Sequence, residues 1–228
     1  MKRISRMLFL IGAVLFLAVP TVAISAVIDF GILAPTPGSI SFAGGANPLV
    51  GSGIEVDNFM AIGTNLHNGE IFTFKGNTDF NGIVQNSAAV LNFSTGNLIG
   101  SDATHWYFAG GGSVTINWPG YGNLLTGSFT QASVTRVGVG TFKIAGAAFL
   151  DTKDNGLENY LDMGGFNSIW TGAFNNSFNA NGAPPAAFTS IGVISGDVVN
   201  TIPEPGTMIL LGSGLVGLAG WGRKKFRK

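Results

Sequence analysis

Residues 113–118 read SVTINW and show the pattern of a half-buried β-strand. Apolar side chains at positions 114, 116 and 118 alternate with polar ones at 113, 115 and 117. Successive side chains of a strand point to opposite faces, so this segment packs one face on a core and turns the other to water. The same short, Gly-bounded pattern recurs through the middle of the chain, and it decides the expected fold.

The segments around it predict a chain built from short strands. Between residues 27 and 201 there are 28 Gly and 19 Asn, which separate runs rich in Val, Ile, Phe and Thr as turn residues do. No run in this region has the repeated amphipathic turns of a helix layer. The expected strands are Ser39 to Phe42, Ile54 to Ala61, Glu70 to Lys75, Ala88 to Ser94, Thr104 to Ala109, Ser113 to Trp118, Leu124 to Val137, Thr141 to Phe149 and Ile191 to Val199.

The fold class that follows is all-β, with an antiparallel β-sandwich or a jelly roll as the expected architecture. A β-helix is the main rival, but the sequence has no repeat of fixed period to support it. Fifteen Phe in this region supply most of the large apolar mass of the core. The segment from Asn179 to Pro185 is expected to be a loop, because adjacent prolines and Asn-Gly resist regular structure.

The first 26 residues have the three parts of a secretory signal peptide. A basic start with Lys2, Arg3 and Arg6 precedes an apolar run from residue 7 to residue 19, which we expect to be helical, and a proline breaks the end. Cleavage after Ala23 would have a small residue at both specificity positions, whereas cleavage after Ala26 would put Ile24 at the earlier one. An uncleaved N-terminal membrane anchor is the alternative.

The last stretch, residues 202–228, also has three parts in fixed order. Pro203, Glu204 and Pro205 are expected to be extended, since two prolines fix φ and remove backbone donors. The apolar run from 208 to 221 gives roughly 21 Å of helix, against about 30 Å of hydrocarbon core, so it makes a short transmembrane helix. The five basic residues that follow are expected to hold the C-terminus in the cytoplasm.

Triplet, short apolar helix and basic tail together resemble the PEP-CTERM sorting signal of Gram-negative bacteria. The resemblance implies that an exosortase, a membrane protease, recognises Pro203, Glu204 and Pro205 and removes the tail. It also implies export across the inner membrane through the secretion translocon, with removal of the leader by signal peptidase, and delivery to the cell surface or extracellular matrix. The apolar run 208–221 would then occupy the inner membrane only transiently. An ordinary C-terminal anchor is the alternative.

Three regions are therefore expected: a signal peptide at 1–26, an exported domain at 27–201 and a sorting signal at 202–228. The formal neutrality of the whole chain conceals an acidic domain, which holds four basic against eleven acidic side chains, a formal charge of −7. Such a domain is a poor partner for nucleic acid, whose phosphates need a positive face.

The chain has no cysteine and two histidines, His67 and His105. Disulfides, thiol nucleophiles and cysteine or histidine-rich metal sites are thereby excluded. Neither histidine lies near the Gly-x-Ser-x-Gly motif of a serine hydrolase, so we expect His67 in a turn or on the surface and His105 in a strand. No catalytic residue and no cofactor are predicted.

One acidic stretch, from Asp151 to Asp162, invites a metal. Asp151, Asp154 and Asp162, with Glu158 between them, could supply oxygen ligands to calcium. Lys153 occupies the third position of the loop, where it would repel a cation. A solvated hairpin turn at Asp154-Asn155-Gly156 is the alternative.

Two functions remain open at this stage. The first is a non-enzymatic structural or adhesive component of a polysaccharide biofilm matrix. The second is a carbohydrate-binding module or a small polysaccharide-active enzyme. A row of solvent-facing aromatics would favour the second. The candidates for such a row are Trp106, Tyr107, Trp118, Tyr121 and Trp170, with Trp106 and Tyr107 on opposite faces of one strand.

Overall fold

The computed structural model describes residues 26–163 and 169–202. The expected signal-peptide helix, the Pro203–Pro205 triplet and the apolar run 208–221 lie outside this part of the chain, apart from Ala26. Within the described residues, no helix has the length and apolar character needed to cross a membrane.

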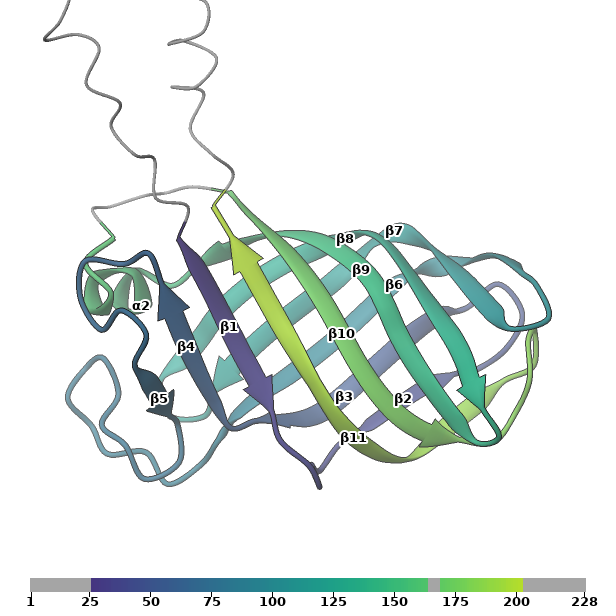
Figure 1. Cartoon of the computed structure of the whole chain (residues 1–228), viewed down its shortest axis with the longest axis horizontal. Helices are drawn as coiled ribbons and strands as arrows, with labels where there is room; N and C mark the ends of the chain where they lie inside the picture. The colour runs from purple at the N-terminus through teal and green to yellow at the C-terminus, as the bar shows by residue number, and fades with distance from the viewer. Residues whose placement is uncertain (1–25, 164–168, 203–228) are drawn as a thin grey trace, which may run out of the picture. The chain divides into compact units, whose positions relative to one another are not determined.

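The described part consists of eleven strands and one short helix (Figure 1). They are β1 (Val27–Ile32), β2 (Ser39–Phe42), β3 (Pro48–Val56), β4 (Asn58–Ile62), β5 (Ile71–Thr73), β6 (Ala89–Ser101), β7 (His105–Trp118), β8 (Gly122–Gly138), β9 (Thr141–Lys153), α2 (Asn155–Tyr160), β10 (Trp170–Ala180) and β11 (Phe188–Thr201). The all-β class expected from the sequence is confirmed.

The sheet closes on itself. The pairing order β10-β9-β8-β7-β6-β3-β2-β11-β1-β4-β5 is completed by a long antiparallel pairing of β10 with β11, from Thr171↔Thr201 to Ala180↔Ser190. Eight strands, β2, β3 and β6–β11, thus form a closed antiparallel barrel, and β1, β4 and β5 continue outward from β11. Figure 1 shows β1, β4 and β5 beside β11 at the end that carries α2.

The expected sandwich or jelly roll is therefore replaced by a single coiled sheet. The difference lies in strand length. The sequence predicts two short strands separated by Gly110–Gly112. In the structure β7 continues through these glycines, with a register shift between Gly111 and Val114. A bulge bends a strand and raises its twist without ending it, and long twisted strands can close one sheet around a core.

Several other strand boundaries differ from expectation. The segment Ile54 to Ala61 divides at Asp57 into β3 and β4, and Asp57 Oδ2 accepts a hydrogen bond from the backbone N–H of Leu33 at 2.8 Å. Strands β1 and β10 were not expected, because β1 adjoins the leader and β10 is rich in Asn and Gly. The expected loop begins where β10 ends, at Ala180.

Aromatic rings fill the barrel. The largest fully buried side chains are Trp106, Trp118, Trp170, Phe30, Phe42, Phe59, Phe74, Phe108, Phe142, Phe149, Phe174 and Phe178. Many of their contacts are edge-to-face, such as Phe42 with Phe108 at 5.4 Å between centroids. The prediction that the phenylalanines form the core is confirmed for those described. This packing supplies the apolar burial on which a chain without disulfides depends.

Two rings lie directly over glycines on the neighbouring strand. Phe149 pairs with Gly172, and Phe93 pairs with Gly51. A Cβ at Gly172 would lie 2.1 Å from the Phe149 ring, and one at Gly51 would lie 2.0 Å from the Phe93 ring. The glycines leave the space that each ring occupies.

We predict that Gly172→Ala displaces the Phe149 ring and lowers the free energy of unfolding by about 1–3 kcal/mol, the usual effect of overpacking. Chemical denaturation measures the change. Gly192→Ala on β11 is the matched control, because a Cβ there meets nothing within 4 Å. Equal stability of the two variants would contradict the packing argument.

The two ends of the described domain meet. Val27 pairs with Thr201, and the backbone N–H of Ile202 donates to the carbonyl of Ala26 at 3.1 Å. Ala26 is buried. Cleavage after Ala23 would keep Ala26 in this contact, whereas cleavage after Ala26 would remove it.

Two carboxylates share the outer face of these terminal strands. Asp29 of β1 pairs with Val199, and Asp197 of β11 pairs with Gly31, which places the two acids diagonally. Burial first, and then the charge of Asp197, raises the pKa of the Asp29 carboxyl. A raised folded-state pKa means that the native state holds the proton more tightly, so stability falls as the pH rises from the unfolded pKa through the folded one.

We predict that Asp197→Asn raises the free energy of unfolding at pH 7 by about 0.2–1 kcal/mol, the range for like charges on neighbouring strands. The gain should shrink below about pH 4, where carboxyls become protonated. Denaturation at pH 3 and pH 7 tests both statements. An equal gain at the two pH values would rule out charge repulsion as the cause.

Candidate functional site

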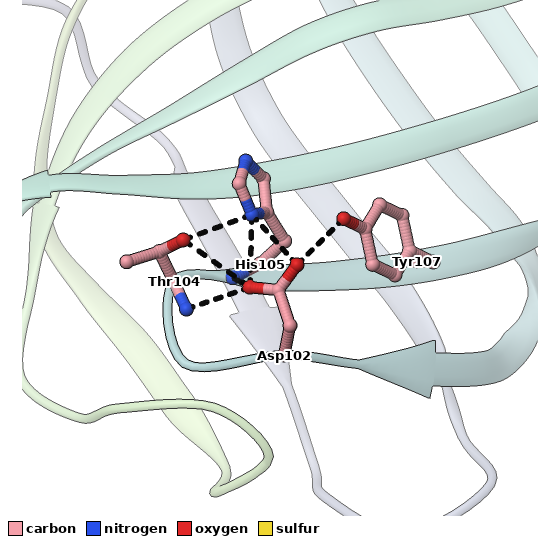
Figure 2. Close-up of polar contacts among 4 residues, drawn as sticks. All are labelled: Asp102, Thr104, His105 and Tyr107. Atoms are coloured by element: carbon pink, nitrogen blue, oxygen red, sulfur yellow. Dashed lines mark hydrogen bonds and ion pairs between the residues drawn. The ribbon is translucent and has the colours of Figure 1, made fainter.

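The most connected polar group on the surface lies where β6 turns into β7. Asp102 Oδ1 accepts hydrogen bonds from the backbone N–H groups of Thr104 at 2.8 Å and His105 at 2.9 Å (Figure 2). The backbone N–H of Asp102 donates to the carbonyl of His105 at 3.1 Å. An aspartate that bonds backbone groups two and three residues ahead is a common way to close a tight turn. We call Asp102, Thr104, His105 and Tyr107 the Asp102 cluster.

Three side chains converge on the same carboxylate. His105 Nδ1 lies 2.9 Å from Oδ1 and 3.1 Å from Oδ2, and the Tyr107 hydroxyl donates to Oδ2 at 2.8 Å. The Thr104 hydroxyl lies 3.2 Å from Oδ1. The His105 and Tyr107 rings are stacked, with centroids 5.6 Å apart.

These donors hold the carboxylate in its charged form. The backbone N–H of Thr104, followed by Tyr107 and His105, lowers the pKa of Asp102 below its usual range. The bond to Asp102 raises the pKa of Tyr107. Since the folded pKa of Asp102 is depressed, the stabilisation is present above the unfolded pKa and is lost as the pH falls through the folded one.

The arrangement resembles a hydrolytic triad in composition but not in geometry. A triad uses one imidazole nitrogen for the nucleophile and the other for the acid. Here the Thr104 hydroxyl, at 2.9 Å, and Asp102 both meet Nδ1 of His105. No proton relay from the hydroxyl through the ring to the acid is formed. The Asp102 cluster therefore stabilises the turn between β6 and β7.

We predict that Asp102→Ala accelerates amide hydrogen exchange at Thr104 and His105 several-fold, because both N–H groups lose their acceptor. Exchange followed by mass spectrometry or NMR measures this. Thr104→Val is the control, since it removes a hydroxyl but keeps both backbone bonds. Unchanged exchange in Asp102→Ala would show that the turn does not depend on the carboxylate.

The three calcium candidates, Asp151, Asp154 and Asp162, have different positions and different contacts in the structure. Asp151 points into the barrel and pairs with Lys153. Asp154 caps α2, accepting from the N–H of Gly156 at 2.8 Å and from the Tyr121 hydroxyl. Asp162 follows the helix in a left-handed conformation, with φ of 48°.

Among residues 26–163 and 169–202, no group of three or more His, Asp or Glu side chains is placed to hold a metal ion. The hairpin turn considered at Asp154-Asn155-Gly156 does not form. Asp154 has the extended backbone and side-chain bonds of an N-cap, so these residues begin α2.

The five aromatic candidates do not form a row on the surface. Trp106, Trp118 and Trp170 are fully buried, and Tyr121 packs between Phe80 and Trp118. Tyr107 is 40% exposed, and it lies on the face of β7 opposite Trp106, as alternation predicted. A flat platform for stacking a sugar chain therefore has at most one of its candidate rings.

The histidines lie where the sequence indicated. His67 is in a turn with φ of 55°, contacts Glu70 at 2.8 Å and stacks on Tyr160. His105 is the first residue of β7.

A second polar group is buried inside the barrel and was not expected. We call it the Lys153 cluster: Lys153, Asp151, Asn200, Glu158 and Trp170. Lys153 Nζ donates to Asp151 Oδ2 and, at 3.1 Å, to Asn200 Oδ1. It also lies 4.8 Å from the centre of the Trp170 ring. Strand alternation places Asp151 and Lys153 on the inner face with Phe149. The acidic stretch from Asp151 to Asp162 suggested a metal-binding loop instead.

The sorting triplet begins two residues after β11, which ends at Thr201. Residues 201–224 match the family model of the PEP-CTERM protein-sorting motif. The match spans Pro203, Glu204 and Pro205 and confirms the resemblance drawn from the sequence. A PEP-CTERM motif implies an exported protein that an exosortase processes and that reaches the cell surface or the extracellular space. Comparisons with curated proteins and with solved structures give no significant match.

Proposed function

We propose that the barrel is a structural or adhesive component of a polysaccharide biofilm matrix, released from its PEP-CTERM tail by an exosortase, and that it is not an enzyme. The observation that carries the proposal is the sorting motif at 201–224, placed directly after the last strand of the domain. A cut near the triplet removes no described strand, so the barrel is complete after processing.

The outer surface supports a role in contact rather than catalysis. Outward-facing positions of the neighbouring strands β8, β9 and β10 include seven uncharged polar side chains, beside the exposed Val137, Lys143 and Leu150. The seven are Thr126, Ser128, Thr130, Gln131, Thr152, Thr171 and Asn179. Hydroxyl and amide groups form hydrogen bonds with the hydroxyls of a polysaccharide without the desolvation cost of charges.

The alternative, a carbohydrate-binding module or a polysaccharide-active enzyme, has less support. Its expected aromatic row is represented by Tyr107 alone, because the three tryptophans are in the core. The Asp102 cluster does not have the geometry of a proton relay from a hydroxyl through an imidazole to an acid. A paired-carboxylate mechanism would need two accessible acids facing one cleft, whereas Asp151 and Glu158 are buried.

We predict that Glu204→Ala leaves export and folding intact but prevents removal of the tail, so that unprocessed protein accumulates in the membrane fraction. Intact mass and C-terminal peptide mapping of protein from the native cells measure this. Thr207→Ala, which leaves the triplet unchanged, is the control and is expected to be processed normally. Normal processing of Glu204→Ala would show that the triplet is not read.

The matrix role has a separate test. The processed protein is incubated with the polysaccharide of the producing cells, and sedimentation measures binding while a reducing-sugar assay measures hydrolysis. Retention without release of sugar supports an adhesive component. Release of sugar would establish the enzyme instead, and absence of retention would remove the adhesive role.

A further inference from the structure

The Lys153 cluster places an amine beside a carboxamide in a site closed to water. The side chains of Lys153 and Asp151 have no solvent-accessible surface, and Asn200 is fully buried. Lys153 comes from the end of β9 and Asn200 from β11, with β10 between them in the sheet. The distance from Lys153 Nζ to Asn200 Oδ1 is 3.1 Å, so the carboxamide carbon is one bond beyond an atom already in contact.

Burial favours the neutral, nucleophilic form of the amine. Desolvation lowers the pKa of Lys153 to about 8, against the opposing charge of Asp151. Burial also raises the pKa of Asp151, which favours its protonated form. A proton can therefore pass from the ammonium to the carboxylate that touches it, because two neutral groups cost less than an ion pair in a dry interior.

The acceptor and the proton carrier are both held in position. Asn200 Oδ1 accepts from Lys153, and Asn200 Nδ2 donates to the carbonyl of Val198 at 3.3 Å, which fixes the amide from both ends. Asp151 Oδ2 faces Lys153, while Oδ1 has no hydrogen-bond partner among the described residues. Trp170 covers the amine from one side. Because the amine and the carboxamide are held side by side, their reaction needs no bimolecular encounter, and the entropic part of the barrier is lowered.

We propose that Lys153 and Asn200 join in an intramolecular amide bond. Asp151 takes a proton from the ammonium of Lys153, and the neutral Nζ attacks Cγ of Asn200 to form the new C–N bond. Asp151 then returns its proton to Nδ2, the Cγ–Nδ2 bond breaks, and ammonia leaves. The Asp151 carboxylate takes the second proton of Nζ, which leaves the neutral secondary amide. The side chains exchange one amine and one carboxamide for a secondary amide and ammonia, so no oxidant or further reactant is consumed.

The bond would tie β9 to β11 across β10, at the place where the barrel closes. The cross-linked residues are 47 apart in sequence, so the link closes a long loop of the unfolded chain. Closing long loops restricts the unfolded ensemble most, as with a disulfide. An exported chain without cysteine would thereby gain a covalent brace that no reductant can open.

Digestion with a Glu-specific protease tests the proposal on the full-length, denatured protein. The protease cuts after Glu70 and Glu158 but not between Glu204 and Pro205, so Lys153 lies on the peptide 71–158 and Asn200 on the peptide 159–228. The expected result is a single branched species whose mass equals the sum of the two peptides less one ammonia. Trypsin should also fail to cut after Lys153, because an acylated lysine is not a substrate.

Two other results would each overturn the proposal. Separate, unmodified peptides would mean that Lys153 remains a free amine in a buried ion pair. A peptide 71–158 that has lost one water, with 159–228 separate and unmodified, would mean that Asp151 rather than Asn200 is the acceptor.

Variants assign the roles. Lys153→Arg keeps a positive charge but offers a guanidinium that does not attack amides, so the branched species should vanish. Asp151→Asn removes the proton carrier and should reduce the linked fraction strongly. Lys143→Arg alters an exposed lysine of the same strand and should leave the link unchanged. The wild-type peptide map decides the question even if the first two variants fail to fold.

Discussion

The pairing of β10 with β11 is the constraint from which the rest of the architecture follows. Without it, the strands would form an open sheet with the eleven-residue strand β10 as an unpaired edge. The pairing of β10 with β11 closes eight strands into a ring, and their inward side chains pack against one another in the core. The ring also removes most of the unpaired strand edge that a secreted protein would otherwise expose to aggregation. Aromatic rings fill the enclosed space, and glycines at 51 and 172 make room for two of them.

Local pattern in the sequence was sufficient for the class of fold and for several strands. Ser39 to Phe42 was placed with the observed bounds, because alternation and flanking glycines agree there. The closure of the sheet was not predictable in the same way, since it depends on register between strands that are distant in the sequence. Gly110–Gly112 illustrates the problem: glycine marks both a turn and a bulge, and only the neighbouring strands decide which one forms.

The site could be predicted to a smaller extent. The sorting motif was found from three residues and their flanking segments, because a peptide signal is read as linear sequence. The calcium candidates Asp151, Asp154 and Asp162 are not gathered at one place, because spacing alone says nothing about the direction of each side chain. Asp151 faces the interior while Asp154 caps a helix, and a six-residue helix leaves too short a pattern to detect. The buried partner of Lys153, Asn200, is 47 residues away, beyond any local motif.

The pairing of Val27 with Thr201 has a mechanical meaning for any load applied at the C-terminal end of the described domain. A pull on the chain beyond Ile202 is transmitted first to β11. That strand is hydrogen-bonded along one side to β10 and along the other to β1 and β2. A load along its axis must shear two rows of bonds at once, rather than peel them one by one from an edge. The strand that such a load reaches first, β11, is thus hydrogen-bonded to neighbouring strands on both sides.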